Sequence, residues 1–358
     1  MQFSAPPATG PAKRSIDTRR LADTLSEDAP FGKEAHVANL LLVTGGGGFI
    51  GSNLVRAVLE AGRTVRVLDN FSTGFRANLE EVARQIDLLE GDLRDPAACR
   101  RACEGADVVL HQAAVPSVPR SMDHPQESFE ANTIGTHNLL MAARKAGVRR
   151  FVFAASSSAY GAGEELPKRE SMPLLPLSPY AAAKAAGELY AATFYRAFGL
   201  ETVSLRYFNV FGPRQDPTNQ YAGVIAAFAS RMLRGQPPVI FGDGTQSRDF
   251  TFVQNAVHAN LLAAEAEAVH GEVVNVGCGE RTDLNTMVGI FNDLLGTDFE
   301  PVYEPPRPGD VKHSLADITA ARDLLGYEPQ VGFRDGLART LDWYRWALET
   351  GYGGWAGR

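Results

Sequence analysis

A tyrosine and a lysine four residues apart, Tyr180 and Lys184, are the residues of this chain best suited to acid–base chemistry, and they lie in the segment SPYAAAK at 178–184. On a helix, this spacing places both side chains on one face, one turn apart. A phenol has a pKa of about 10 and is a weak base at neutral pH. A neighbouring ammonium group stabilises the phenolate and lowers that pKa. The pair therefore predicts a tyrosine that removes a proton from a bound hydroxyl group.

Three hydroxyl side chains precede this pair at the end of an apolar segment. Residues 151–155 read FVFAA, and Ser156, Ser157 and Ser158 follow directly. If the segment is a parallel strand, the serines lie at the edge of the sheet where ligands bind. One hydroxyl is then expected to share a proton with Tyr180 and a substrate, while the others cap and turn the chain. The alternative is a chance pairing of Tyr and Lys, and the serines argue against it.

A glycine-rich turn joins an apolar strand pattern at 40–43 to a helical pattern at 52–61, through Gly45 to Gly48 and Gly51. Glycine lets the backbone bend sharply and approach a ligand closely. The start of the helix offers N–H groups and a positive dipole end to a diphosphate. Asp69 ends the next apolar strand pattern, where dinucleotide-binding folds place a carboxylate on the ribose diol. The strand, the glycine turn, the helix and Asp69 together therefore predict a dinucleotide-binding site.

The carboxylate of Asp69 also indicates which dinucleotide binds. It accepts hydrogen bonds from a 2′-hydroxyl but repels a 2′-phosphate, which favours NAD over NADP. Residues 70–74 contain no cation, and Arg76 is the first one after Asp69. Asp92, after a further apolar strand pattern, could accept a hydrogen bond from the adenine amino group, and the small Ala113 and Ala114 would let the cofactor pass close to the backbone.

The composition narrows the class of protein. The chain has 358 residues, is 44% hydrophobic and carries a formal charge of −7, which suits one large domain or two closely joined ones and disfavours nucleic-acid binding. No apolar run reaches the roughly 18 residues that a membrane span requires. The chain has three cysteines, a small odd number that argues against a disulfide framework and predicts a reducing, cytoplasmic location. The cysteines and histidines show no spacing typical of metal ligands.

Strand and helix patterns alternate along the chain, which predicts an α/β fold with a doubly wound, Rossmann-like parallel sheet. We expect residues 1–38 to form a tail with one short helix at 15–26. Residues 39–206, with the return of 253–280, would form the NAD-binding domain, and 207–252 with 281–350 a smaller C-terminal lobe. The expected strands are 39–44, 64–69, 86–90, 107–111, 150–156 and 201–207, and the expected helices are 52–61, 76–84, 96–104, 127–147 and 179–198.

These residues together resemble the extended short-chain dehydrogenase/reductase family over residues 39–345, and within it the nucleotide-sugar 4-epimerases. The resemblance comprises TGxxGxxG at 44–51, Asp69, Ser156, Tyr180-x-x-x-Lys184 and RYFN at 206–209. It is closest to bacterial UDP-N-acetylglucosamine 4-epimerases, on the segments 111–114, 117–121, 212–217 and 310–314. It implies bound NAD, a UDP-sugar lobe, a homodimer formed by the helices 127–147 and 179–198, and a role in supplying surface polysaccharides.

The resemblance also implies a set of contact residues. Arginine guanidinium groups in the segments FGDGTQSRD and RPGD would bind the diphosphate of UDP, and Ser314 would leave room for a 2-N-acetyl group. Cofactor contacts are expected from Gly45, Gly48, Phe49, Ile50, Gly51, Asp69, Asn70, Ser72, Thr73, Gly74, Asp92, Leu93, Gln112, Ala113, Ala114, Thr133, Tyr180, Lys184 and Phe208. Substrate contacts are expected from Ser117, Ser156, Ser157, Tyr180, Asn209, Val224, Phe241, Arg248, Arg307, Asp310 and Ser314.

The implied reaction inverts carbon 4 of a UDP-hexose or UDP-N-acetylhexosamine. Tyr180 removes the 4-hydroxyl proton, Ser156 orients that hydroxyl, NAD takes up a hydride, and the 4-keto sugar turns over before the hydride returns. The expected catalytic residues are Ser156, Tyr180 and Lys184. The expected substrates are UDP-N-acetylglucosamine and UDP-N-acetylgalactosamine, with UDP-glucose and UDP-galactose as further candidates.

Three alternatives are weighed against this interpretation. A UDP-glucuronate 4-epimerase shares most of the machinery and is the main enzymatic alternative. Sugar 4,6-dehydratases place an Asp-Glu pair directly after the serine or threonine, where this chain has Ser157 and Ser158. A non-catalytic NAD-binding regulator predicts a broken Ser/Tyr/Lys set, whereas this chain keeps all three residues.

Overall fold

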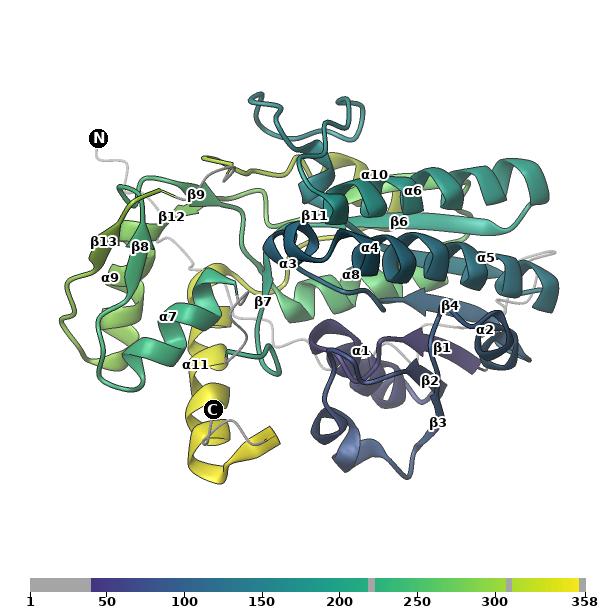
Figure 1. The fold of residues 1–358 in the computed structure, drawn as a ribbon, viewed down its shortest axis with the longest axis horizontal. Helices are drawn as coiled ribbons and strands as arrows, with labels where there is room; N and C mark the ends of the chain where they lie inside the picture. Colours follow the sequence, from purple (N-terminus) through teal and green to yellow (C-terminus); the bar gives the residue numbers. More distant parts are fainter. Residues whose placement is uncertain (1–39, 218–222, 307–310, 354–358) are drawn as a thin grey trace, which may run out of the picture. The chain divides into compact units, whose positions relative to one another are not determined.

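The central element is a parallel sheet of seven strands, in the order β11-β6-β5-β4-β1-β2-β3 (Figure 1). It is seen in a computed structural model that describes residues 40–217, 223–306 and 311–353. The Rossmann-like fold is therefore confirmed, including the predicted return of a late strand, β11, beside β6. The strands are β1 (Leu40–Thr44), β2 (Thr64–Asp69), β3 (Ile86–Glu90), β4 (Val108–His111), β5 (Arg150–Ser156), β6 (Glu201–Tyr207) and β11 (Glu272–Val276).

Helices cover both faces of the sheet because successive apolar side chains of its strands point to opposite sides. On β1, Leu41 and Val43 belong to one buried cluster, whereas Leu42 belongs to another. The first cluster is closed by α1 (Phe49–Glu60) and α8 (Val253–Glu265). The second is closed by α2 (Pro96–Cys103), α5 (Gly135–Ala146) and α6 (Pro179–Phe198).

Three helices differ from their predicted form. Helix α1 begins at Phe49 because Gly48 already takes the N-cap position. The segment Arg76–Val82 forms a 3₁₀ helix, labelled η2. The helix expected at 127–147 is present as an unbroken helical stretch from Pro125 to Ala146, with a π-helical turn inside it. Its parts are α4 (Pro125–Phe129), the π-helical turn η3 (Glu130–Ile134) and α5. A separate short helix, α3 (Val118–Asp123), precedes it.

After β6 come further short elements, most of which lie beyond the carboxyl ends of the sheet strands, whereas α10 packs beside β11 (Figure 1). Strands pair in twos, β7 with β10, β8 with β13 and β9 with β12. These elements are β7 (Val210–Phe211), α7 (Val224–Met232), β8 (Val239–Phe241), β9 (Ser247–Arg248), β10 (Thr251–Phe252), β12 (Thr282–Asp283), α9 (Leu284–Leu295), β13 (Val302–Glu304), α10 (Thr319–Leu325) and α11 (Phe333–Thr350).

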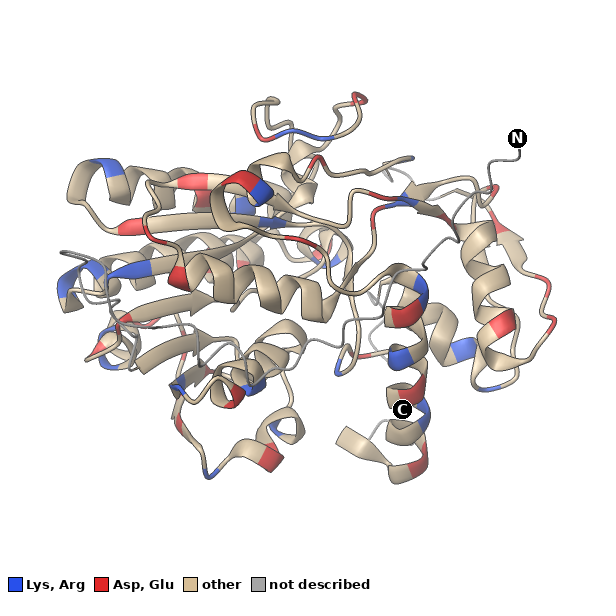
Figure 2. Cartoon of the chain, turned by 180° about the vertical axis from the view of Figure 1, so that it is seen from behind, with Lys and Arg blue, Asp and Glu red and all other residues tan. Residues whose placement is uncertain are grey.

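Charged residues of both signs are interspersed over the same elements (Figure 2). This distribution agrees with the modest net charge of the chain. Among the residues that the structure describes, no helix combines the length and the apolar character that a bilayer span needs.

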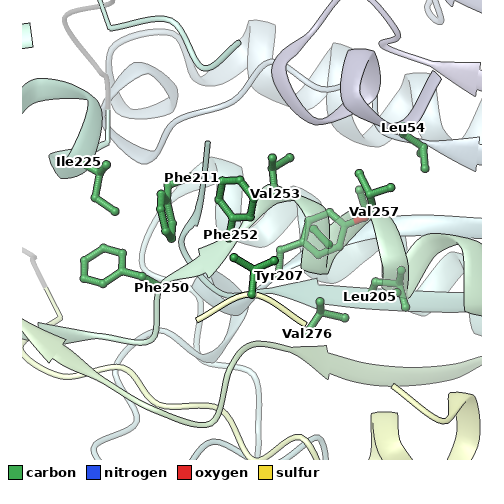
Figure 3. Packing of buried hydrophobic residues seen from close by; sticks show 14 of the residues in the cluster. Leu54, Leu205, Tyr207, Phe211, Ile225, Phe250, Phe252, Val253, Val257 and Val276 are labelled. Carbon is green, nitrogen blue, oxygen red and sulfur yellow. The ribbon is translucent and has the colours of Figure 1, made fainter. Parts of the chain in front are cut away.

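One buried cluster runs from the sheet into the later elements (Figure 3). The Phe211 ring lies 5.7 Å from the Phe252 ring and 6.4 Å from the Phe250 ring, measured between centroids. Leu205 of β6 and Ile225 of α7 belong to the same cluster. The later elements are thus packed onto the sheet through a shared core, and the boundaries of the two predicted domains stay a prediction.

Candidate active site

A cavity of ≈ 380 Å³ opens at the carboxyl ends of the strands, as expected for a parallel α/β sheet. Many of the residues predicted to contact a cofactor line it: Gly45, Gly48, Phe49, Ile50, Gly51, Asp69, Asn70, Ser72, Thr73, Gly74, Asp92, Leu93, Gln112, Ala113, Ala114, Tyr180 and Lys184. Thr133 and Phe208 are not among its lining residues. The Phe208 side chain is fully buried beside Tyr160, and its predicted contact with the cofactor stays a prediction.

The glycine turn leaves no room for side chains. Gly45 has a φ of +68°, and a Cβ there would lie 2.7 Å from the backbone of Ala113. A Cβ on Gly51 would lie 2.1 Å from the carbonyl oxygen of Gly45. No side chain caps the start of α1, and its first turn holds no acidic residue. Its N-terminus therefore suits a diphosphate, which fits a dinucleotide.

Asp69 joins the glycine turn to the end of β2. Its carboxylate accepts hydrogen bonds from the backbone N–H groups of Gly47, at 2.8 Å, and Phe71, at 2.7 Å. Burial raises the pKa of this carboxyl above its ordinary value. Arg76 is paired with Glu90 at 2.5 Å and lies over the Phe71 ring. Because its guanidinium is engaged in this way, the arrangement suits a ribose diol better than a 2′-phosphate.

The Asp92 carboxylate, which was expected to bind the adenine amino group, already accepts several hydrogen bonds within the chain. Its carboxylate accepts hydrogen bonds from the backbone N–H, Nε and Nη2 of Arg94, and from Nδ2 of Asn70 at 2.8 Å. The Arg94 guanidinium lowers the pKa of Asp92 to about 2. A carboxylate has about four acceptor positions. A hydrogen bond from an adenine amino group would therefore compete with Arg94 or Asn70, and that role stays a prediction.

The start of α6 positions the predicted catalytic pair. Ser178 caps the helix by accepting a hydrogen bond from the Ala181 N–H at 3.1 Å, and Pro179 occupies the first turn. Tyr180 and Lys184 then lie one turn apart and both line the cavity. The Lys184 Nζ atom lies 5.9 Å from the centroid of the Tyr180 ring. The predicted spacing thus brings the two groups to one place.

One serine of the three lies near the phenol. Ser156, the last residue of β5, is close enough to Tyr180 to lower the pKa of its hydroxyl group. The Ser158 hydroxyl donates to Ser156 Oγ at 2.9 Å, and the Ser158 N–H also points to that oxygen. Ser157 to Tyr160 form a 3₁₀ turn, η4. Ser156 is therefore placed for proton sharing, while Ser158 orients it.

The pKa of the phenol differs from the expectation drawn from the sequence. Burial raises the pKa of Tyr180 above its ordinary value, although the hydrogen bond with Ser156 lowers it. Burial also lowers the pKa of Lys184 to about 8. The Lys184 ammonium donates to the Ala154 carbonyl oxygen at 2.7 Å. In the chain alone, desolvation thus outweighs the acidifying effect expected of the lysine.

A buried histidine, His111, ends β4 directly before the cavity-lining residues Gln112 and Ala113. His111 Nδ1 lies 2.7 Å from Thr44 Oγ1, and Nε2 lies 2.9 Å from Thr136 Oγ1. The Thr136 hydroxyl donates its proton to the Asn132 carbonyl oxygen, so it must accept from Nε2–H. His111 Nδ1 then accepts from Thr44. Burial lowers the pKa of His111 to about 3, so the ring is neutral.

This chain of hydrogen bonds extends to the turn after β4. The Ala113 N–H donates to Thr44 Oγ1 at 3.2 Å. The Asn132 side chain bonds both the N–H and the carbonyl of Val115. Asn132 lies in the π-helical turn η3, which brings it to this position. Asn132 and Thr136 are not among the residues predicted from the sequence, although their four-residue spacing places both on one face of the helix.

A second polar centre organises the predicted substrate residues. Asp249 is fully buried, and its carboxylate accepts hydrogen bonds from the N–H groups of Cys278, Gly279 and Ala316. Burial raises its pKa to about 6. The Asp249 carbonyl oxygen accepts from Asn209 Nδ2 at 2.9 Å. This aspartate therefore ties together three segments of the later elements.

Arg248 and Ser314 lie next to that centre. The Asp249 N–H donates to the Ser314 carbonyl oxygen at 2.9 Å. Arg248 Nη1 donates to the carbonyl oxygens of Ser247, at 3.0 Å, and Lys312, at 2.9 Å. Asn209, Arg248 and Ser314 are thus brought to one cluster.

The other predicted substrate residues are more dispersed. Ser117 lines the cavity in a strained backbone conformation, with a φ of +91°. Ser157 begins η4, Val224 begins α7 and Phe241 ends β8. Arg307, Asp310 and the predicted helix at 15–26 lie outside the described residues. The cavity is also lined by Arg94, Arg214 and Gln215, which the sequence did not single out as contact residues.

Comparison with known proteins identifies the group to which this architecture belongs. Residues 41–277 match the model of the NAD dependent epimerase/dehydratase family. UDP-glucose 4-epimerase of Mycolicibacterium smegmatis is 40% identical over 308 residues, which cover 85% of this chain and 98% of that protein.

Two solved structures are also similar. UDP-N-acetylglucosamine 4-epimerase from Methanobrevibacter ruminantium M1, in complex with UDP-N-acetylmuramic acid, is 40% identical, with a TM-score of 0.82 and coverage of 86% of this chain and 98% of that one. UDP-glucuronic acid 4-epimerase from Bacillus cereus, in complex with UDP-glucuronic acid and NAD, is 31% identical, with a TM-score of 0.80 and coverage of 86% and 99%.

Substitution of Gly51 tests the glycine turn. We expect Gly51→Ala to lower the free energy of unfolding by about 1–3 kcal/mol, because the new methyl group collides with the Gly45 carbonyl. Bound NAD should be lost as well. Gly289→Ala is the matched control: its site on α9 is open, and the change should raise stability by about 0.5–1 kcal/mol. Denaturant unfolding and absorbance of the released nucleotide measure both effects. Unchanged NAD content in Gly51→Ala would contradict the assignment of the turn.

Proposed function

Because the chain belongs to the NAD dependent epimerase/dehydratase family, we propose that it interconverts UDP-N-acetylglucosamine and UDP-N-acetylgalactosamine. It is a nucleotide-sugar 4-epimerase of that family and thus an isomerase. The observation that carries the proposal is that Tyr180 and Lys184 line a cavity whose glycine turn and Asp69 suit a dinucleotide. Ser156 is near enough to Tyr180 to lower the pKa of its phenol.

The glycine turn, the N-terminus of α1 and Asp69 would hold NAD at one end of the cavity. NAD, when bound, supplies a nicotinamide that can accept a hydride from sugar carbon 4 and return it. Tyr180 Oη would take the proton of the 4-hydroxyl group, and Ser156 Oγ would hold that hydroxyl in line. Because the chain alone raises the pKa of Tyr180, the phenol needs a further positive charge before it can act as a base.

The acetylated substrate is supported by the substrate-side cluster. Arg248, and by its sequence motif Arg307, would bind the diphosphate through their guanidinium groups. Ser314 lies within the hydrogen-bonded cluster around Asp249, and a serine there leaves space that a bulky aromatic side chain would fill. UDP-glucose and UDP-galactose would fit the same space.

A UDP-glucuronate 4-epimerase is the second candidate. The similarity to the Bacillus cereus enzyme over 86% of this chain supports it. Dehydration is disfavoured because Ser157 and Ser158 follow the catalytic serine, so that no carboxylate stands there to move the proton of carbon 5.

We also propose that the enzyme is a homodimer. Large apolar side chains are exposed on the neighbouring helices α4, α5 and α6, which lie side by side in Figure 1. His137 of α5 and Tyr190 of α6 contact each other with their ring centroids 5.4 Å apart. The exposed residues are Phe129, Met141, Leu189, Tyr190 and Phe198. An apolar surface of this kind is typical of a face that a second copy covers.

Removal of the phenol hydroxyl tests the proposed base. We expect Tyr180→Phe to lower kcat for inversion at carbon 4 by about 10²–10⁴-fold while the protein stays folded. Tyr195→Phe, on the same helix, should leave kcat within twofold of the unmodified enzyme. NMR of the sugar products measures both rates. Full activity of Tyr180→Phe would refute the role of this residue.

Enlargement of Ser314 tests the substrate assignment. We expect Ser314→Tyr to lower kcat/KM for UDP-N-acetylglucosamine at least about tenfold relative to UDP-glucose. The unmodified enzyme should turn over UDP-N-acetylglucosamine faster than UDP-glucuronate. If UDP-glucuronate were the better substrate, the second candidate would replace the first.

An acidic substitution on α6 tests the dimer. Leu189 is 66% exposed, so Leu189→Glu should convert a dimer into a monomer without unfolding the chain. Val302→Glu, at an exposed residue of β13, is the control and should leave the dimer intact. Light scattering coupled to size-exclusion chromatography gives the mass. A monomeric unmodified protein would contradict the proposal.

A further inference from the structure

A third ionisable residue, Glu188, lies on the face of α6 that carries Tyr180 and Lys184. Glu188 follows Lys184 by four residues, as Lys184 follows Tyr180, so the three side chains lie in one row along the helix. Glu188 is only 2% exposed. Its carboxylate binds Arg206 of β6 with both oxygens, Oε1 to Nε at 2.9 Å and Oε2 to Nη2 at 2.7 Å. Arg206 is 4% exposed, so the ion pair is buried.

The partners of Arg206 lead back to the catalytic serine. The Arg206 guanidinium lies 4.7 Å from the centroid of the Tyr160 ring. Tyr160 ends the turn η4, which begins directly after Ser156, and its hydroxyl donates to Asn275 Oδ1 at 2.7 Å. The buried ion pair therefore touches both structural elements that hold Tyr180, the helix α6 and the serine turn.

Glu188 also affects the protonation of Lys184, because its negative charge favours the ammonium form. Lys184 Nζ lies 5.9 Å from the centroid of the Tyr180 ring and donates to the Ala154 carbonyl oxygen at 2.7 Å. Glu188, one turn further along α6, and the neutral His111 of β4 are the other ionisable groups that act on it, and Arg206 of β6 binds Glu188. Burial lowers the pKa of Lys184 to about 8, and the charge of Glu188 acts in the opposite direction. Lys184 would lose its proton more easily if this carboxylate were neutral.

We propose that Glu188 is a positioning residue of the reaction: it keeps the Lys184 ammonium charged and ties α6 to β6 and the serine turn through Arg206. The inference rests on the proposed function, because it assumes that charged Lys184 serves the base Tyr180. Glu188 does not line the cavity and acts only through its neighbours.

Glu188→Gln tests this role, since glutamine keeps the shape of the side chain and removes its charge. The alkaline limb of the kcat profile should move to lower pH by about one unit, because Lys184 deprotonates earlier. KM should change less than twofold. In protein labelled with ¹⁵N-lysine, the Nζ resonance assigned through Lys184→Arg should titrate at correspondingly lower pH. Glu188→Asp keeps the charge and should restore most of the profile.

Glu201→Gln is the matched control, because Glu201 pairs with the buried Arg150 at 2.5 Å but does not line the cavity. It should lower stability and leave the pH profile unchanged. If Glu188→Gln fails to fold, the double variant Glu188→Gln with Arg206→Gln removes both charges and should still move the limb to lower pH. An active enzyme whose pH limb and Nζ titration do not move would overturn the role of Glu188. An unmodified enzyme that inverts no UDP-sugar would instead refute the proposed function.

Discussion

The site depends on how closely helix α6 packs on strand β5. Gly187 makes this approach possible, since a Cβ there would lie 2.3 Å from the ring of Phe153. At that separation, Lys184 donates a hydrogen bond to the Ala154 carbonyl oxygen, and Ser156 is close enough to Tyr180 to lower the pKa of its phenol. A helix lying further from the sheet would keep its sequence motif but separate the base from the serine. The motif is therefore meaningful only together with the small residue one turn beyond it.

The cavity and the later elements are held in different ways. At the glycine turn of the cavity, backbone contacts dominate: glycines without side chains and a carboxylate on the N–H groups of the turn. In the later elements, the buried Asp249 joins separate segments through three backbone N–H groups. Both centres place a carboxylate where it organises the backbone. The shared aromatic core around Phe211 packs these later elements onto the sheet.

The sequence predicted the elements whose pattern is local. The strands and the bounds of α6 follow from apolar alternation and spacing, and NAD follows from the glycine turn with Asp69. It missed features that tertiary contacts decide. The π-helical turn exists where Asn132 bonds Val115. The Phe208 side chain is buried, and its cofactor contact stays a prediction, as do the roles of Ser156, Tyr180 and Lys184. The raised pKa of Tyr180 likewise reflects burial, which neighbours in the sequence do not reveal.

The central claim is that this cavity inverts carbon 4 by removing its hydrogen and giving it back out of contact with water. The most direct measurement follows UDP-N-acetylglucosamine that carries deuterium at carbon 4. We expect both epimers at equilibrium to retain the deuterium at carbon 4, even after many turnovers in ordinary water. Loss of the label to the solvent would show that the hydrogen leaves as an exchangeable proton, and it would rule out hydride transfer to and from a bound nicotinamide.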